Sequence, residues 1–193
     1  MFTEPFIQDK LNKEAGWIEV ITGPMFSGKT EELMRRVRRA RIANQNIEIF
    51  KPEIDSRYDK VKVVSHDESS MESKVVKSPI KILDQSSKAE VVAIDEIQFF
   101  DLEIIEITKE LANNGKRVIV AGLDKDYLGK PFGPVPGLMT TSEFVTKLHA
   151  ICVKCGGLAS FSFRVKPSSE KILLGATEEY EARCRNCFYA ENA

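Results

Sequence analysis

The chain has 193 residues, of which 42% are hydrophobic, and its 28 basic and 29 acidic side chains leave a net charge of −1. That is enough for one ordinary domain with an appendage, and the balanced charge gives no sign of a nucleic-acid-binding surface. No apolar run approaches the ~18 residues of a membrane-spanning helix. Residues 1–15 lack the apolar core of a secretory signal, so we expect a loosely ordered N-terminal arm, a cytoplasmic protein and no membrane partner.

Apolar runs alternate along the chain with segments of helical periodicity. Strands are predicted at Trp17–Thr22, Asn46–Phe50, Val75–Lys77, Val91–Ile94 and Val118–Ala121. Helices are predicted at Lys29–Ala43, Ile80–Ser86, Asp101–Asn114 (with Asp101 as its cap) and Ser142–His149. This alternation predicts an α/β fold with a parallel sheet between two layers of helices.

The first helix carries five arginines: Arg35, Arg36, Arg38, Arg39 and Arg41. They could form an anion-binding face, but cations near the negative C-terminal end of a helix are favoured by its dipole. We interpret them as a solvated helix side.

A glycine-rich segment joins the first strand to the first helix. It consists of Gly23, Pro24, Met25, Phe26, Ser27, Gly28, Lys29 and Thr30, which is the pattern G-x-x-x-x-G-K-T. In a strand–loop–helix context, backbone N–H groups of this P-loop surround phosphate oxygens. Lys29 adds a positive charge at the β- and γ-phosphates, and the Thr30 hydroxyl can ligate Mg²⁺. The segment predicts binding of a nucleoside triphosphate.

Two adjacent carboxylates, Asp95 and Glu96, follow the dense apolar strand Val91–Ile94. Asp95 can organise Mg²⁺, and Glu96 can remove a proton from the attacking oxygen. The reaction is ATP hydrolysis if that oxygen belongs to water, and a kinase reaction if it belongs to a hydroxyl. Arg57 and Arg164 could each stabilise the charge of phosphoryl transfer or simply lie on the surface, and spacing does not choose between them.

The segment Leu123–Gly137 is rich in glycine and proline and follows the end of a strand. Ligands of open α/β sheets bind at that end, so we expect this loop to line the site rather than serve only as a connector.

All four cysteines lie in the last quarter of the chain, as two C-x-x-C pairs: Cys152 with Cys155, and Cys184 with Cys187. Two such pairs can supply four thiolates to a structural Zn²⁺; a redox role is the alternative. Zinc would close residues 156–183 into a loop, with a strand at Leu158–Arg164 and a return strand at Ile172–Gly175. The metal either staples a small lobe or holds a substrate-covering flap. In the second case, losing zinc should weaken substrate binding and spare ATP binding.

Taken together, these motifs resemble the zinc-containing, P-loop thymidine kinases. The resemblance is carried by the P-loop, by Asp95-Glu96-Ile97-Gln98-Phe99-Phe100, by Lys130-Pro131-Phe132-Gly133 and by the two cysteine pairs. It implies a RecA-like P-loop α/β sheet with helices on both faces plus a small zinc-bound β lobe. It also implies a kinase domain at 16–150 and a zinc-binding lasso domain at 151–193, whereas the arm expected at 1–15 lies outside the resemblance.

The resemblance further implies that ATP phosphorylates thymidine, and deoxyuridine, on the 5′-hydroxyl, with Glu96 as general base and with Asp95 and Thr30 on the Mg²⁺ side. On the phosphate side the family's positions match Gln98, Asp55, Ser56 and Arg57. On the nucleoside side they match Met25, Phe99, Leu123, Tyr127, Phe132, Arg164, Tyr180 and the return strand Lys171, Ile172, Leu173, Leu174 and Gly175. The family also implies a homotetramer inhibited by thymidine triphosphate.

Two positions depart from the family pattern: Tyr127 stands where the family usually has Phe, and Ile97 where smaller residues are common. Two rival functions remain open at this point. One is a DNA-stimulated ATPase with a zinc knuckle, which the absence of a basic, aromatic-studded groove disfavours. The other is a nucleotide sensor in which Glu96 is idle.

Overall fold

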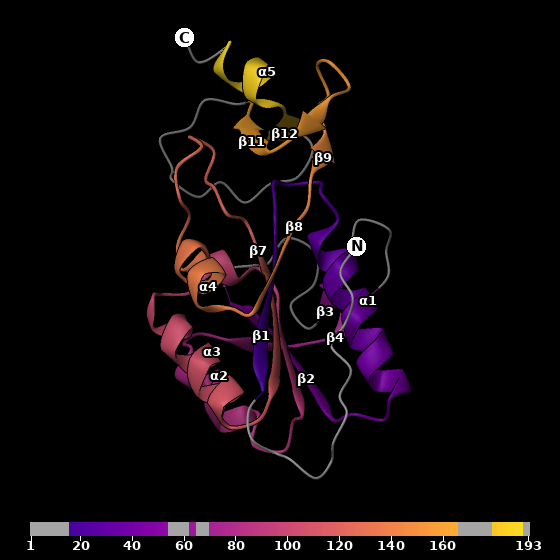
Figure 1. The fold of residues 1–193 in the computed structure, drawn as a ribbon, viewed down its shortest axis with the longest axis vertical. Coiled ribbons are helices and arrows are strands. Elements are labelled where there is room, and N and C mark those ends of the chain that lie inside the picture. The colour runs from indigo at the N-terminus through magenta and orange to yellow at the C-terminus, as the bar shows by residue number, and fades with distance from the viewer. Residues whose placement is uncertain (1–15, 54–61, 65–69, 166–178, 191–193) are drawn as a thin grey trace.

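The computed structural model describes residues 16–53, 62–64, 70–165 and 179–190 (Figure 1). These residues build a six-stranded sheet in the order β5-β2-β6-β7-β1-β8. Its strands are β1 (Trp17–Thr22), β2 (Ile47–Pro52), β5 (Lys74–Val76), β6 (Val91–Ile94), β7 (Arg117–Gly122) and β8 (Phe144–Lys147). Every neighbouring pair runs parallel, so the carboxyl ends of all these strands lie at one edge of the sheet.

Helices cover both faces of this sheet, which confirms the predicted α/β class. Helix α1 (Lys29–Ile42) lies on one face (Figure 1). The other face is covered by α2 (Ile80–Gln85), α3 (Glu103–Asn113) and α4 (Val135–Thr141). Alternate side chains of each strand pack against the two helix layers, because successive residues of a strand point to opposite faces. In β1, Ile18 and Val20 pack on the α3 side, whereas Ile21 packs on the α1 side.

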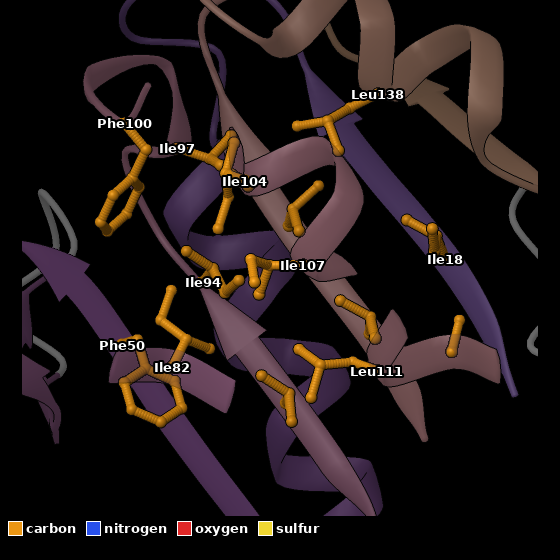
Figure 2. Packing of buried hydrophobic residues seen from close by; sticks show 14 of the residues in the cluster. Ile18, Phe50, Ile82, Ile94, Ile97, Phe100, Ile104, Ile107, Leu111 and Leu138 are labelled. Atoms are coloured by element: carbon orange, nitrogen blue, oxygen red, sulfur yellow. The ribbon is translucent and has the colours of Figure 1, made fainter. Parts of the chain in front are cut away.

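The larger core lies between the sheet and α2, α3 and α4 (Figure 2). Ile94 of β6 and Phe50 of β2 meet Ile104 and Leu111 of α3 there, and Ile82 of α2 closes the cluster. All four residues of β6 are buried, as expected for a central parallel strand with helices on both sides. This packing fixes the end of β6, where Asp95 and Glu96 follow.

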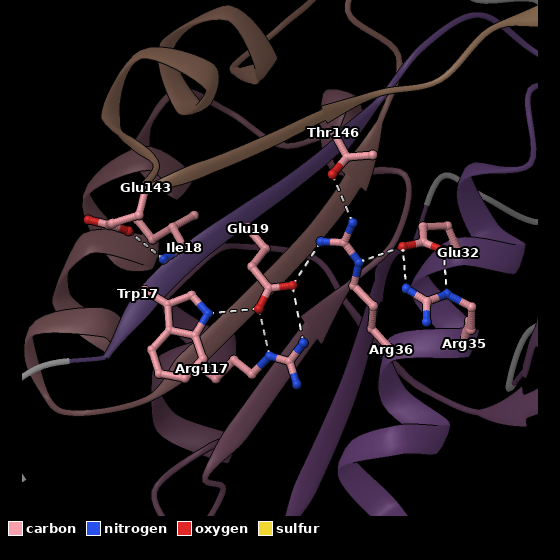
Figure 3. A network of polar contacts seen from close by, with 9 residues as sticks. All are labelled: Trp17, Ile18, Glu19, Glu32, Arg35, Arg36, Arg117, Glu143 and Thr146. Atoms are coloured by element: carbon pink, nitrogen blue, oxygen red, sulfur yellow. Dashed lines mark hydrogen bonds and ion pairs between the residues drawn. The ribbon is translucent and has the colours of Figure 1, made fainter. Parts of the chain in front are cut away.

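A buried polar network joins α1 to the sheet (Figure 3). Glu19, in the middle of β1 and fully buried, pairs with Arg36 of α1 at 2.8 Å and with Arg117 of β7 at 2.6 Å. Arg36 also donates to Thr146 of β8 at 2.9 Å. The interpretation of the α1 arginines as a solvated side is therefore wrong for Arg36. It holds for three of them, which are exposed: Arg38, Arg39 and Arg41.

A small lobe, which we call the cysteine lobe, lies beyond the carboxyl edge of the sheet (Figure 1). It consists of β9 (Ala150–Ile151), β10 (Leu158–Ala159), β11 (Phe161–Arg164), β12 (Tyr180–Arg183) and α5 (Arg185–Tyr189). Strands β9 and β10 pair antiparallel, as do β11 and β12. A separate short hairpin is formed by β3 (Lys62–Val64) and β4 (Ser70–Glu72).

The structure corrects several sequence-based element boundaries. The helix expected at Ser142–His149 is wrong: 144–147 is strand β8, paired with β1, and the helix of this region is α4, which begins within the predicted loop. Strand β2 continues through Pro52, because its last residues pair with β5. Asp101 does not cap α3 with its side chain; the cap residue is Leu102.

In the cysteine lobe, the predicted strand at 158–164 is two strands, β10 and β11. The return strand expected at 172–175 lies outside the described residues; among the described strands, β11 pairs with β12. Among the described residues, no helix is long and apolar enough to cross a membrane.

Candidate functional site

The P-loop connects the end of β1 to the start of α1. Gly28 occupies the left-handed region with φ 81°, which a glycine adopts without steric cost, and α1 begins directly after it. The Ser27 hydroxyl donates to the Pro24 carbonyl at 2.8 Å, and the Lys29 ammonium donates to the same oxygen at 2.7 Å. The loop therefore curls around the Pro24 carbonyl and places the N-terminus of a 14-residue helix behind it, which is an arrangement suited to phosphate.

The predicted metal-side pair meets across the sheet. The Thr30 hydroxyl donates to Asp95 Oδ2 at 3.1 Å, although 65 residues separate the two in the chain. Asp95 is buried, and its other carboxylate oxygen accepts the Glu96 backbone N–H at 3.0 Å. A hydroxyl and a carboxylate at the mouth of a P-loop are the oxygen donors that Mg²⁺ prefers, so the two residues fit that ion.

Glu96 adopts a left-handed backbone conformation with φ 51°, which is uncommon outside glycine and clusters at functional sites. Its carboxylate accepts a short hydrogen bond from the Gln98 side-chain amide. Gln98 is itself buried, and its amide oxygen accepts the Leu123 backbone N–H at 3.0 Å. Gln98 thus links the Glu96 carboxylate to the end of β7 by two hydrogen bonds. Glu96 directly follows Asp95, which contacts Thr30 of the P-loop.

The loop after β7 packs on this same region. Phe132 meets Phe99 edge to face with ring centres 5.9 Å apart. A Cβ on Gly133 would lie 2.4 Å from the Gln98 carbonyl oxygen, so only glycine allows this close approach. These contacts place the loop at the carboxyl edge of the sheet, and that it lines a ligand site stays a prediction.

A second cluster joins this loop to the cysteine lobe. The Arg164 guanidinium lies 3.6 Å from the centre of the Tyr127 ring, and it donates to the Tyr180 hydroxyl at 3.0 Å. Three of the positions expected on the nucleoside side therefore lie together, although they come from three separate segments. Arg164, which sequence reasoning left between a catalytic and a surface role, is partly buried among aromatic rings.

The four cysteines converge as predicted. Their sulfur atoms all lie within 4.8 Å of one another, and Cys155 and Cys184 are 3.6 Å apart, too far for a disulfide. Tetrahedral zinc with Zn–S bonds of about 2.3 Å needs sulfurs roughly 3.8 Å apart, so this group fits the ion. Hydrogen bonds with the neighbouring thiols of Cys184 and Cys155 raise the pKa of Cys187 to about 12.

Some predicted residues cannot be placed, and some residues that contact the site were not predicted. Asp55, Ser56 and Arg57, and also 171–175, lie outside the described residues. Sequence reasoning missed Ser162, whose hydroxyl accepts the Met25 backbone N–H at 2.9 Å. It also missed Asp124, which pairs with Lys147 and Lys125. Asp124 lies just after the end of β7, as Asp95 lies just after β6. Its position in the sequence could therefore have identified it as a residue of the site.

Comparison with known proteins agrees with this geometry. A family model described as thymidine kinase matches residues 16–188. This chain belongs to the thymidine kinase family. The thymidine kinase of Rhodothermus sp. (strain ITI 518) is 55% identical over 173 residues, which cover 90% of this chain and 81% of that protein.

Two further relatives from other genera carry the same name. The thymidine kinase of Bacteroides thetaiotaomicron is 54% identical over 188 residues, covering 97% of this chain and 94% of that protein. The thymidine kinase of Porphyromonas gingivalis is 54% identical over 173 residues, covering 90% and 85%. As a member of the thymidine kinase family, the protein is a phosphoryl-transferring enzyme, and a kinase of this type uses ATP.

Proposed function

We propose that this protein is an ATP:thymidine 5′-phosphotransferase, which also accepts deoxyuridine. The observation that carries the proposal is the Thr30–Asp95 hydrogen bond at the mouth of the P-loop, with Glu96 held immediately beside it. Membership in the thymidine kinase family supports thymidine as the substrate, and the adjacent carboxylates support transfer to a hydroxyl.

The phosphate end of the reaction uses residues 23–30. Backbone N–H groups of the loop and of the first turn of α1 bind the β- and γ-phosphates, and the Lys29 ammonium exchanges the Pro24 carbonyl for a phosphate oxygen. Thr30 and Asp95 would hold Mg²⁺. Held there, the ion would offset negative charge on the phosphate oxygens. Arg57 and its neighbours Asp55 and Ser56 are proposed to act on the same side.

Glu96 is the proposed general base. It removes the proton of the 5′-hydroxyl as that oxygen attacks the γ-phosphorus, while the ADP oxygen leaves on the opposite side. Gln98, which the family resemblance placed with the nucleotide, donates to Glu96. We therefore give it the role of orienting the carboxylate.

The nucleoside is proposed to lie between two groups of side chains. Phe99 and Phe132, in edge-to-face contact, form one group, and Tyr127, Arg164 and Tyr180 form the other. Met25, within the P-loop, and Leu123, directly after β7, are also proposed to line the nucleoside side. The backbone of 171–175 is proposed to read the pyrimidine, which rejects a purine by size and by donor pattern.

The remaining proposals rest on the family, on the clustered cysteine sulfur atoms in the case of zinc, and on composition in the case of the arm. We infer a structural zinc at the four cysteines, a homotetramer, and inhibition by thymidine triphosphate. We also retain the division into an arm at 1–15, a kinase domain at 16–150 and a lasso domain at 151–193.

The test is a panel of nucleosides incubated with ATP labelled on its γ-phosphate. We expect the label in thymidine 5′-monophosphate and in deoxyuridine 5′-monophosphate, with little in inorganic phosphate. Equal release of inorganic phosphate with and without thymidine would make the protein an ATPase and contradict the proposal. Phosphorylation of deoxycytidine as fast as thymidine would retain the kinase but overturn the substrate.

A further inference from the structure

The P-loop touches the cysteine lobe, or the segment that enters it, at three points. The Met25 backbone N–H donates to the Ser162 hydroxyl at 2.9 Å, across 137 residues of sequence. The Phe26 side chain packs on the buried cluster of the lobe. A Cβ on Gly23 would lie 2.4 Å from the Leu148 carbonyl oxygen, so the chain entering the lobe passes directly over the start of the loop. In Figure 1 the segment between β1 and α1 reaches up to this lobe.

Ser162 is built into the lobe rather than displayed on its surface. It lies in β11, only 4% of its surface is exposed, and it pairs with Ala182 of β12. Its hydroxyl accepts the Met25 N–H, so that N–H is not offered to phosphate. Phosphate is therefore bound by the N–H groups that follow Met25 in the loop. The hydrogen bond with Ser162 fixes the part of the loop that precedes them.

Phe26 is the next residue, and its backbone is in the left-handed region with φ 64°. That conformation is unfavourable for any side chain larger than hydrogen, so it persists only where the surroundings hold it. The surroundings here are the lobe's buried cluster, made of Ala150, Cys152, Ala159 and Ala182. Cys184 and Cys187 pack against the same cluster, so the proposed zinc ligands and the P-loop share one small core.

We propose that the cysteine lobe sets the conformation of the P-loop, with Ser162 and Phe26 as positioning residues for nucleotide binding. The integrity of the cysteine cluster then controls ATP affinity as well as thymidine affinity. This changes the expectation drawn from the sequence, in which losing zinc spares ATP binding. The inference rests on the proposed function only in that the P-loop binds ATP.

The first experiment is Ser162→Ala in the full-length protein, with the affinity for Mg-ADP measured by calorimetry in the absence of nucleoside. Loss of one hydrogen bond predicts an affinity about three- to tenfold weaker. Ser160→Ala is the matched control, because its hydroxyl contacts His149 and not the P-loop. We expect the control to stay within about twofold of wild type.

Turnover separates positioning from general damage to the fold. For Ser162→Ala we expect the KM for ATP to rise while kcat at saturating ATP stays within about twofold, whereas a partly unfolded population lowers kcat. Equal Mg-ADP affinity in wild type and Ser162→Ala would overturn the inference. A wild type that binds no Mg-ADP would instead contradict the proposed function, and the inference with it.

A second pair of variants tests Phe26. Phe26→Ala and Phe26→Gly both remove the ring, but only glycine adopts the left-handed conformation without steric cost. We expect both to bind Mg-ADP more weakly than wild type, with Phe26→Gly about fivefold tighter than Phe26→Ala. Wild-type affinity in Phe26→Ala would show that the ring does not position the loop.

The third experiment removes zinc from the full-length protein with a chelator and confirms the loss by elemental analysis. We expect Mg-ADP affinity to fall at least as far as in Ser162→Ala, and to return when zinc is restored. Undiminished Mg-ADP affinity in metal-free protein would show that the lobe does not govern the P-loop.

Discussion

At the scale of single residues, Asp124 links the carboxyl edge of the sheet to two lysines. Its carboxylate lies 2.6 Å from the Lys147 ammonium and 2.9 Å from the Lys125 ammonium. Burial by itself raises the pKa of Asp124, but the two lysines outweigh it and hold that pKa below its usual value of 3.8. Lys125 continues to the Ser160 carbonyl at 3.3 Å and so reaches the cysteine lobe.

We expect Asp124→Asn to lower the free energy of unfolding by about 1–3 kcal/mol at pH 7, because it removes a buried, charge-assisted pair. A carboxyl group whose pKa is lowered by folding stabilises the protein at pH values above its unfolded-state pKa of 3.8. This stabilisation is lost as the pH falls through the folded-state pKa. The difference between the two proteins should therefore shrink below pH 3.8. Urea denaturation at pH 6 and near pH 3 measures it, and an unchanged difference would contradict the pairing.

Gln98 is a second residue whose contacts suggest a specific role, which is to orient the Glu96 carboxylate. Its amide joins the Glu96 carboxylate to the Leu123 backbone N–H. We expect Gln98→Ala to lower kcat about tenfold or more, because the carboxylate loses its fixed orientation, with Mg-ADP affinity within about twofold.

Gln85→Ala, at the exposed end of α2, is the control for that variant and should leave kcat unchanged. A fall in Mg-ADP affinity with unchanged kcat in Gln98→Ala would return Gln98 to the nucleotide-binding role that the family resemblance implied.

At the scale of elements, α1 is held to the sheet by charge as well as by apolar packing. Glu19 lies between Arg36 and Arg117 and also accepts the Trp17 indole N–H at 2.7 Å (Figure 3). Because α1 starts at the P-loop, this network also fixes the direction from which the helix N-terminus faces the phosphates.

We expect Glu19→Gln to lower the free energy of unfolding by about 3 kcal/mol, because it removes the negative charge that two buried guanidinium groups share, while Arg36 keeps its ion pair with Glu32. Glu106→Gln removes an exposed pair with Lys109 and should cost less than about 1 kcal/mol. Denaturation by urea measures both, and similar small effects in the two variants would show that the network adds little stability.

The elements differ in how far the sequence predicts them. Strands β1, β6 and β7 are rich in apolar residues because helices cover both of their faces, and such strands are plain in the sequence. Strand β8 has four residues that alternate between partly buried and exposed, and among the described strands it pairs with β1 alone. So short a pattern does not distinguish a strand from a helix. The strands of the cysteine lobe have two to four residues, too few for a periodic signal.

At the scale of the whole molecule, the local motifs of the candidate site and the contacts that hold them also differ in how far the sequence predicts them. The P-loop and the Asp95–Glu96 pair follow from local motifs whose strand contexts are explicit in the sequence. The contacts of Ser162 with Met25 and of Asp124 with Lys147 join distant segments, and their geometry is set by how the lobe and the sheet edge pack. The sequence therefore predicts which residues carry the chemistry, and the structure shows which contacts hold those residues in place.

The cysteine lobe takes part in the proposed mechanism at two places. It contributes Arg164 and Tyr180 to the proposed nucleoside side, and through Ser162 it contacts the P-loop. One lobe thus touches both proposed substrate sites, which suits a reaction that must bring two substrates together and keep water from the transferring phosphate.

The central claim is that Glu96 is the general base of phosphoryl transfer to a nucleoside hydroxyl, and Glu96→Gln tests it most directly. The measurement is turnover of thymidine at saturating ATP, together with Mg-ADP affinity of the same protein, with Glu103→Gln at the exposed start of α3 as the control. We expect kcat of Glu96→Gln to fall about 100-fold or more with Mg-ADP affinity within about threefold, and the control to match wild type. Turnover by Glu96→Gln at the wild-type rate would contradict the account.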